Sequence, residues 1–174
     1  MKTVGIISDT HGLLRPEAAA ALAGVELIVH AGDIGAAEII DALRQIAPVH
    51  AIRGNVDRGA WAGEFSPTEI VEVEGQSLYV LHDLYELDLD PVAAGFRVVI
   101  SGHTHDPVVK EERGVVYLNP GSAGPRRFKL PISLARMTVG EIDEKRGVPG
   151  APTMQMLDFG SGPRRIAVDL IRLE

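Results

Sequence analysis

The sequence contains no cysteine, which excludes disulfide bonds and thiolate metal sites. It has no apolar run near the ~18 residues that a membrane-spanning helix needs, and its first apolar run, which ends at Ile7, is too short for a secretory signal. It also lacks an excess of basic residues, because its net charge is −7. That charge argues against a general nucleic-acid-binding surface. These absences favour a cytoplasmic protein that has neither a membrane nor nucleic acid as a general partner.

Aromatic residues are also scarce, at 5% of the chain, whereas hydrophobic residues in total make up 45%. The core must therefore consist mainly of alanine, valine, isoleucine and leucine, which suits a sheet covered by helices. A chain of 174 residues is long enough to bury about 70% of its unfolded surface, so we expect a single domain over residues 1–174. The sequence carries no internal repeat and no signal for an oligomeric state.

The first third of the chain alternates apolar runs with helical patterns. Because strands separated by helices are typical of parallel βαβ units, we expect ligands to collect at the carboxyl ends of these strands. Pro16 near its first turn and Gly24 after its end bound the first helix, and Pro48 follows the second. The predicted strands are 3–8, 26–30 and 49–52, and the predicted helices are 15–23 and 35–46.

Shorter elements follow. Residues 68–73 and 76–81 alternate in polarity on either side of Glu74-Gly75 and predict a hairpin. The other predictions are a short helix at 88–95, strands at 96–100 and 115–118, strands at 132–139 and 165–173 that close a second sheet, and a loop or long hairpin at 140–162.

Potential metal ligands follow the predicted strands, with glycines nearby. The strand that ends at Ile100 leads through Gly102 to His103 and His105, and imidazole is the commonest metal ligand. Taken alone, this His-x-His pattern is also compatible with two surface histidines in a loop. The same arrangement recurs at other strand ends, and the full set of candidates is Asp9, His11, Asp33, Asn55, His82, His103 and His105.

So many oxygen and nitrogen ligands exceed the four of one zinc site. They suit two divalent metal ions that share a carboxylate. Carboxylates offset metal charge and can bridge, imidazoles add nitrogen ligands, and a neutral amide adds coordination without further negative charge. Two-metal sites clamp the attacking and leaving oxygens of an in-line displacement at phosphorus. The set therefore indicates a metal-dependent phosphoesterase.

Motifs in a fixed order resemble the calcineurin-like metallophosphoesterases. They are Ser8-Asp9-Thr10-His11-Gly12, Gly32-Asp33, Gly54-Asn55, His82 after an apolar strand, and Gly102-His103-Thr104-His105. Asn119-Pro120-Gly121-Ser122, followed by Pro125-Arg126, resembles the small bacterial and archaeal phosphodiesterase branch. The resemblance runs from about residue 3 to residue 127. It implies an α/β fold, a four-layer αββα sandwich of two mixed sheets flanked by helices.

The resemblance also implies how the ligands divide. The first metal would take Asp9, His11, Asp33 and His105, and the second would take Asp33, Asn55, His82 and His103, with Asp33 as the bridge. Asp33, Asn55 and His82 are therefore expected to serve catalysis as well. A hydroxide activated by both metals would attack a small phosphate-ester substrate, most readily a diester. Manganese is the occupant that the resemblance implies, and the ligand set also admits Fe, Zn, Co or Ni.

The chain departs from the family pattern after two of the motifs. Val56 stands where many relatives have a histidine that is thought to assist the leaving group. After His82, Asp83 replaces the usual glycine, and Leu84 replaces a histidine that small members often have. The set of metal ligands is complete, whereas the residue that would act as general acid is not identified.

Three further residues have two interpretations each. His30 either supports a ligand from behind or is a hydrogen-bonded strand histidine. Arg53 and Arg126 either contact substrate phosphate or form surface salt bridges. A competing function also exists, because the same fold serves as an interaction scaffold in a eukaryotic trafficking complex, where the metal-site pattern is eroded. A non-catalytic metal-binding scaffold is therefore the alternative, and the complete ligand set favours the enzyme.

Overall fold

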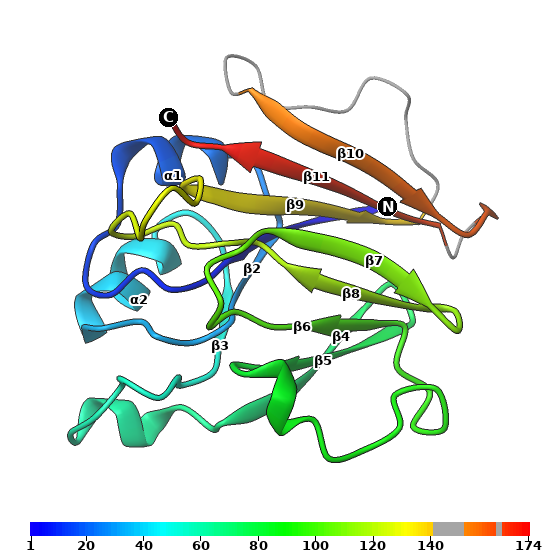
Figure 1. The fold of residues 1–174 in the computed structure, drawn as a ribbon, viewed down its shortest axis with the longest axis horizontal. Coiled ribbons are helices and arrows are strands. Elements are labelled where there is room, and N and C mark those ends of the chain that lie inside the picture. Colours follow the sequence, from blue (N-terminus) through cyan, green and yellow to red (C-terminus); the bar gives the residue numbers. More distant parts are fainter. Residues whose placement is uncertain (141–151, 163–164) are drawn as a thin grey trace.

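The computed structural model describes residues 1–140, 152–162 and 165–174. The strands form two mixed sheets (Figure 1), which confirms the predicted α/β class. In spatial order, the first sheet contains β10 (Thr153–Phe159), β11 (Ile166–Arg172), β9 (Ser133–Val139), β1 (Lys2–Ile7), β2 (Leu27–His30) and β3 (Val49–Ala51). The second sheet contains β4 (Thr68–Val73), β5 (Gln76–Leu81), β6 (Val98–Ile100), β8 (Val115–Asn119) and β7 (Val108–Glu112).

The predicted βαβ units are present in the first sheet. β1 pairs with β2, and β2 with β3, both in parallel, and the crossovers contain α1 (Pro16–Ala21) and α2 (Ala37–Arg44). Both helices are shorter than predicted. α1 begins at Pro16, whose missing N–H costs nothing in the first turn, and the chain after α2 closes in backbone turns up to Ala47. The three parallel strands therefore end at one edge of the sheet.

The second sheet begins with the predicted hairpin. β4 and β5 pair antiparallel, and both turn residues have positive φ, 49° at Glu74 and 72° at Gly75, as a type I′ turn requires. β5, β6 and β8 then pair in parallel. Their carboxyl ends also lie together at one edge.

The prediction for the two closing strands is wrong in one respect. β9 pairs antiparallel with β1, and β11 with β9, so both strands belong to the first sheet and not to the second. Nearly every residue of β9 and β11 is buried, and such strands carry no pattern that specifies which sheet they join.

Three other segments differ from the predictions or extend them. Residues 88–95 form backbone turns around Pro91, and not a helix. β7 was not predicted, because it is an edge strand whose residues are mostly exposed and lack a clear alternation. Of the segment predicted as a loop or long hairpin, residues 153–159 form β10, which pairs with β11, and residues 141–151 lie outside the described residues.

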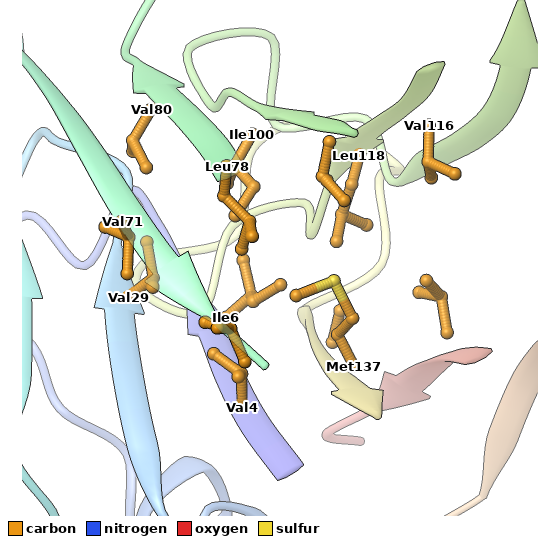
Figure 2. Packing of buried hydrophobic residues seen from close by; sticks show 14 of the residues in the cluster. Val4, Ile6, Val29, Val71, Leu78, Val80, Ile100, Val116, Leu118 and Met137 are labelled. Atoms are coloured by element: carbon orange, nitrogen blue, oxygen red, sulfur yellow. The ribbon is translucent and has the colours of Figure 1, made fainter. Parts of the chain in front are cut away.

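Two apolar layers hold the first sheet. Figure 2 shows the layer between the sheets, where Val4 and Ile6 of β1 lie opposite Leu78 and Ile100 of the second sheet. In the other layer, Leu22, Ile39, Ile40 and Leu43 from the helical segments pack with Ile7, Ile28 and Leu134 from the strands. Burying one such side chain contributes about 1.5–3 kcal/mol, so the strand ends are rigid mounts for side chains.

The outer face of the second sheet is covered by apolar side chains and turns, whereas the helical segments cover the first sheet. Leu81, Val99 and Val115 pack there with Tyr79 and Tyr117. The chain between β5 and β6 contains a 3-10 turn, η2 (Leu84–Glu86), followed by backbone turns. The part of the chain that the structure describes contains no helix that is long and apolar enough to cross a membrane.

Candidate metal centre

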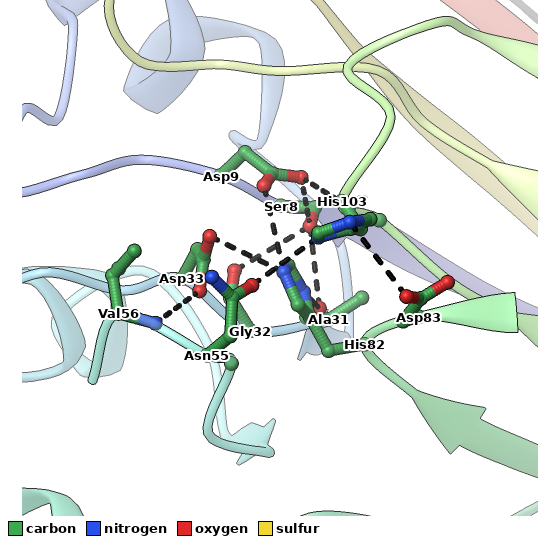
Figure 3. A network of polar contacts seen from close by, with 12 residues as sticks. Ser8, Asp9, Ala31, Gly32, Asp33, Asn55, Val56, His82, Asp83 and His103 are labelled. Carbon is green, nitrogen blue, oxygen red and sulfur yellow. Dashed lines mark hydrogen bonds and ion pairs between the residues drawn. The ribbon is translucent and has the colours of Figure 1, made fainter. Parts of the chain in front are cut away.

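The candidate ligands gather where strand ends of both sheets meet, as Figure 3 shows for several of them. Asp9 comes after β1, Asp33 after β2, Asn55 after β3, His82 after β5, and His103 and His105 after β6. Backbone hydrogen bonds tie the segments together. The Asp9 N–H donates to Gly32 O over 3.0 Å, and the Gly102 N–H donates to His82 O over 2.9 Å.

The two oxygens of the Asp9 carboxylate have different surroundings. Asp9 Oδ2 accepts hydrogen bonds from Ser8 Oγ at 2.7 Å and from the His103 backbone N–H at 3.1 Å. Asp9 Oδ1 is 3.2 Å from His105 Nε2, 3.8 Å from His11 Nε2 and 3.9 Å from His82 Nε2. Because Asp9 is fully buried, Oδ1 faces three imidazoles away from solvent.

Asp33 repeats this division. Its Oδ1 accepts a hydrogen bond from the Val56 backbone N–H at 3.0 Å. Its Oδ2 lies 3.2 Å from His82 Nε2 and 3.8 Å from His11 Nε2. Each carboxylate thus has one oxygen fixed by the protein and one that faces the imidazoles.

The hydrogen bond of His82 determines which of its ring nitrogens faces the carboxylates. His82 Nδ1 lies 2.8 Å from Ala31 O and must donate to it, so in the neutral ring Nε2 carries a lone pair toward the two carboxylates. Within the described residues, the buried side-chain atoms without a hydrogen-bond partner are Asp9 Oδ1, His82 Nε2 and His105 Nδ1. Buried polar atoms are rarely left unpaired. Lone pairs that face one another require a cation between them, so these residues fit a metal ion.

The possible ligand atoms form two groups. Asp9, His11 and His105 form one and Asp9, Asp33 and His82 form the other, with the ligand atoms of each group within 4.8 Å of one another. Asn55 and His103 line a cavity beside His82, and Asn55 Oδ1 is 3.2 Å from His103 Nδ1. The structure therefore brings all the predicted ligands into one region, and the acid common to the two groups is Asp9.

The charges of the site influence its protonation. Burial alone would raise the pKa of Asp33, but the approach of His82 and the Val56 N–H outweigh it, so the pKa lies below its ordinary value. Burial lowers the pKa of His11, against the opposing effects of Asp33 and Asp9. Burial would also lower the pKa of His82, yet the two carboxylates raise it. A proton therefore competes with a metal ion for His82.

Most of the candidate ligands share an unusual backbone conformation. Positive φ values occur at Asp9 (54°), His11 (46°), Asp33 (53°), His103 (69°) and His105 (62°). This left-handed region is uncommon for residues other than glycine, although Asp and His are enriched there. It turns the chain sharply just after each strand and brings consecutive side chains toward the centre.

A glycine permits close approach between the loop after β2 and the loop after β3. A Cβ at Gly54 would overlap the backbone nitrogen and the carboxylate of Asp33. Nearby, buried Asp57 accepts hydrogen bonds from the backbone N–H groups of Ile34 at 3.1 Å, Gly35 at 2.8 Å and Gly54 at 2.8 Å. Asp57 thus joins the loop after β2 to the loop after β3.

His30 supports the centre from behind. Its Nδ1 accepts from the Gly32 N–H at 3.2 Å, so in the neutral ring Nε2 carries the hydrogen and donates to Thr10 Oγ1 at 2.9 Å. Thr10 Oγ1 donates in turn to Ile34 O. Complete burial lowers the pKa of His30 to about 4, so the ring is neutral at pH 7. Both sequence interpretations are therefore combined in one residue, since it is a satisfied strand histidine that also positions two ligand loops.

This buried histidine predicts a pH dependence of stability. An unfolded histidine binds a proton below about pH 6.5, whereas folded His30 does so only near pH 4. Between these values the unfolded state holds more protons, so the free energy of unfolding falls as the pH is lowered from 6.5 to 4, by about 3 kcal/mol from this group. Urea unfolding at several pH values should show a shallower dependence in His30→Asn. Equal pH slopes in both proteins would contradict the assignment.

The two arginines that could contact phosphate, Arg53 and Arg126, differ in their contacts. Arg53 donates through Nη1 to Phe65 O at 2.8 Å and also lines the cavity beside His82. Arg126 forms an ion pair with Glu174, which agrees with its salt-bridge interpretation. Its neighbour Arg127 instead contributes to lowering the pKa of His11, so its charge acts on the site. Sequence reasoning chose Arg126 because a guanidinium group can pair with phosphate oxygens, and it missed Arg127.

Ser8 is another residue that sequence reasoning missed. Ser8 is buried and directly precedes Asp9, and its hydroxyl donates a hydrogen bond to the Asp9 carboxylate. The available signal was a hydroxyl residue that ends an apolar strand directly before a candidate ligand. Its role is to orient one oxygen of Asp9.

The cavity beside His82 has a volume of about 190 Å³ and is open to solvent. It is lined by Arg53, Asn55, His82, Asp83, Glu86 and His103, among others. A single cation faces several acceptors and imidazoles there. Buried carboxylates and imidazoles with free lone pairs, beside such a cavity, define the centre of a metal-dependent hydrolase.

Comparison with known proteins agrees with this class. Residues 1–142 match the calcineurin-like phosphoesterase superfamily domain. A probable metallophosphoesterase of Methanothermobacter thermautotrophicus is 35% identical over 169 residues, which cover 90% of this chain and 98% of that protein. The chain belongs to the calcineurin-like phosphoesterase superfamily, and its function is that of a metal-dependent phosphoesterase.

Two further relatives are informative. A phosphodiesterase of Methanocaldococcus jannaschii is 29% identical over 162 residues, which cover 82% of this chain and 93% of that protein. The solved structure of vacuolar protein sorting 29 from Cryptosporidium parvum matches with a TM-score of 0.70 at 18% identity and covers 98% of both chains. The latter likeness concerns the fold alone.

Proposed function

We propose that this protein is a phosphodiesterase whose centre holds two divalent metal ions. The observation that supports it most is the buried Asp9 Oδ1, which faces the Nε2 atoms of three histidines and has no hydrogen-bond partner. Asp9, His11, Asp33 and His105 would hold one ion, and Asp33, Asn55, His82 and His103 the other. When bound, such ions supply positive charge for a phosphate ester and lower the pKa of a bound water.

The protein's own residues prepare the site before a substrate arrives. Ser8 and Val56 each fix one oxygen of a carboxylate, and the Ala31 carbonyl fixes the tautomer of His82. Positioned groups need little reorganisation during reaction, which favours transition-state stabilisation. The cavity beside His82 would receive the phosphate ester, with Arg53 as the cation in its wall.

A diester is favoured over a monoester by the charges of the cavity. Asp83 and Glu86 both line it, and Arg53 is the one cation among the described residues of its wall. A diester carries one negative charge and a monoester carries up to two, so acidic walls oppose the monoester more strongly. The relative from Methanocaldococcus jannaschii, a phosphodiesterase, supports the same preference.

Removal of metal tests the proposed function. Protein treated with a chelator should lose hydrolysis of bis(p-nitrophenyl) phosphate, and added manganese should restore it. Each of Fe, Zn, Co and Ni is then compared with manganese on the same protein, together with p-nitrophenyl phosphate as the monoester. Full activity in protein that elemental analysis shows to be free of metal would rule the proposal out.

The alternative is a metal-binding scaffold without turnover, and the fold shared with vacuolar protein sorting 29 is the observation behind it. A scaffold would bind manganese with normal stoichiometry and leave every phosphate ester intact. The complete set of ligands in this chain supports the enzyme.

A further inference from the structure

A second cavity lies next to the one beside His82, with a volume of about 430 Å³. Its walls come from the chain after β5, from the loop after β6 and from β7 and β8. The residues that characterise it are Asp83, Leu84, Tyr85, Val108, Lys110 and Tyr117. None of them belongs to the predicted ligand set.

The two cavities are lined by the same residue, Asp83, and by neighbouring residues of one loop. Gly102 and Thr104 line the larger cavity, whereas His103 between them lines the smaller one. Asp83 Oδ2 is 3.6 Å from His103 Nε2, so this pair of side chains lies beside both cavities. A phosphate ester at the centre can therefore extend one of its substituents past this pair.

The walls of the larger cavity favour a flat apolar group. Leu84 and Val108 leave apolar surface exposed at its rim, and Tyr85 is 94% exposed. Isolated exposed apolar residues are ordinary, but several around one cavity mark a binding site. Lys110 Nζ lies 5.4 Å from the centre of the Tyr117 ring, which places one cation against an aromatic wall. Its volume lies within the usual range for small-molecule sites.

Asp83 also shapes this rim. Its Oδ1 accepts a hydrogen bond from the Tyr85 N–H at 3.0 Å and so caps η2. Asp83 therefore fixes the turn that carries Leu84 and Tyr85. Asp83 and Leu84, the two residues after His82, both line this cavity.

We propose that the larger cavity is a subsite for an aromatic ester group of the substrate. This inference rests on the proposed phosphodiesterase function and adds a substrate class to it. The phosphate remains at the metal centre, and an aryl substituent lies between Leu84, Val108 and the tyrosine rings. Offset or edge-on contact with those rings is the geometry that aromatic groups favour.

Phosphonates that cannot be hydrolysed test the subsite by binding alone. Manganese-loaded protein is titrated calorimetrically with phenylphosphonate and with methylphosphonate. We expect phenylphosphonate to bind at least about tenfold more tightly, because even one added methylene in an apolar pocket is worth about that factor. In Val108→Trp the indole fills the cavity, so the ratio of the two dissociation constants should fall close to one.

Ile70→Trp is the matched control. Ile70 and Val108 are both exposed and lie on the two opposite edge strands of the second sheet, and Ile70 is absent from the cavity walls. Ile70→Trp should keep the tenfold ratio. Leu84→Ser, which removes apolar wall without filling the cavity, provides a second test if Val108→Trp fails to fold, and it should also reduce the ratio.

The possible results distinguish failure of the subsite proposal from failure of the proposed function. Equal binding of the two phosphonates by the parent protein, or a ratio that Val108→Trp and Leu84→Ser leave unchanged, would overturn the subsite. If methylphosphonate still binds and p-nitrophenyl diesters are still cleaved, the phosphodiesterase proposal survives that result. If neither phosphonate binds and no diester is cleaved, both proposals fail.

Discussion

Asp33→Ala is expected to lose both metal ions and more than about 100-fold in diester hydrolysis. Asp33 Oδ2 lies near both His82 and His11, so this carboxylate reaches both parts of the centre. Loss of a partner that only orients a ligand typically costs 10–100-fold in metal affinity or activity, and loss of a shared ligand should cost at least as much. Elemental analysis of the purified variant measures the stoichiometry directly.

Two other variants make this result specific. Asn55→Ala should weaken mainly the second ion, because Asn55 Oδ1 lies 3.2 Å from His103 Nδ1, on the side proposed for that ion. Asp41→Ala removes an exposed carboxylate of α2 and should retain both ions. Two tightly held ions in Asp33→Ala would disprove the bridging role.

Hydrolysis should depend steeply on the leaving group, with p-nitrophenyl diesters cleaved quickly and simple alkyl diesters very slowly. General acid catalysis is worth about 10²–10⁴-fold and matters most for basic leaving oxygens. Val56 supplies no acid, since its contribution to the centre is its backbone N–H. Asp83 Oδ1 accepts a hydrogen bond from the Tyr85 N–H, and Asp83 Oδ2 lies 3.6 Å from His103 Nε2. Rates for diesters of graded leaving-group pKa measure the slope.

Val56→His and Asp83→Asn test this explanation in opposite directions. A histidine at position 56 should flatten the slope if its ring reaches the leaving oxygen. Asp83→Asn should leave the slope unchanged if Asp83 only orients His103 and η2. Similar rates for alkyl and p-nitrophenyl diesters in the parent, with chemistry rate-limiting, would show that an acid exists. A selective loss of alkyl hydrolysis in Asp83→Asn would identify Asp83 as that acid.

The location of the site could be predicted from the sequence because it depends on strand ends. Apolar runs locate β1, β2 and β5, and polar residues such as Asp9, Asp33 and His82 follow them directly. The carboxyl ends of parallel strands meet at one edge, so residues distant in sequence are expected to lie together. No knowledge of individual side-chain contacts was needed for that step.

The remaining features depend on contacts that no local pattern encodes. β9 and β11 are buried along nearly their whole length, so only packing decides that they extend the first sheet. Arg126 and Arg127 are adjacent and chemically identical, and the ion pair with Glu174 at the end of the chain distinguishes them. The left-handed backbone of His103 likewise follows from tertiary contacts, because histidine does not require it.

The left-handed backbone conformation of the ligand residues lowers the stability of the fold while it positions the ligands. Each such conformation costs a residue other than glycine roughly 1–2 kcal/mol, and His11 and His105 both adopt it. Glycine at these positions would relieve the cost while removing a ligand, so the metal-free fold would become more stable as the centre was lost. Stability alone would therefore favour glycine at both positions, so the two histidines are explained by what they bind and not by the fold.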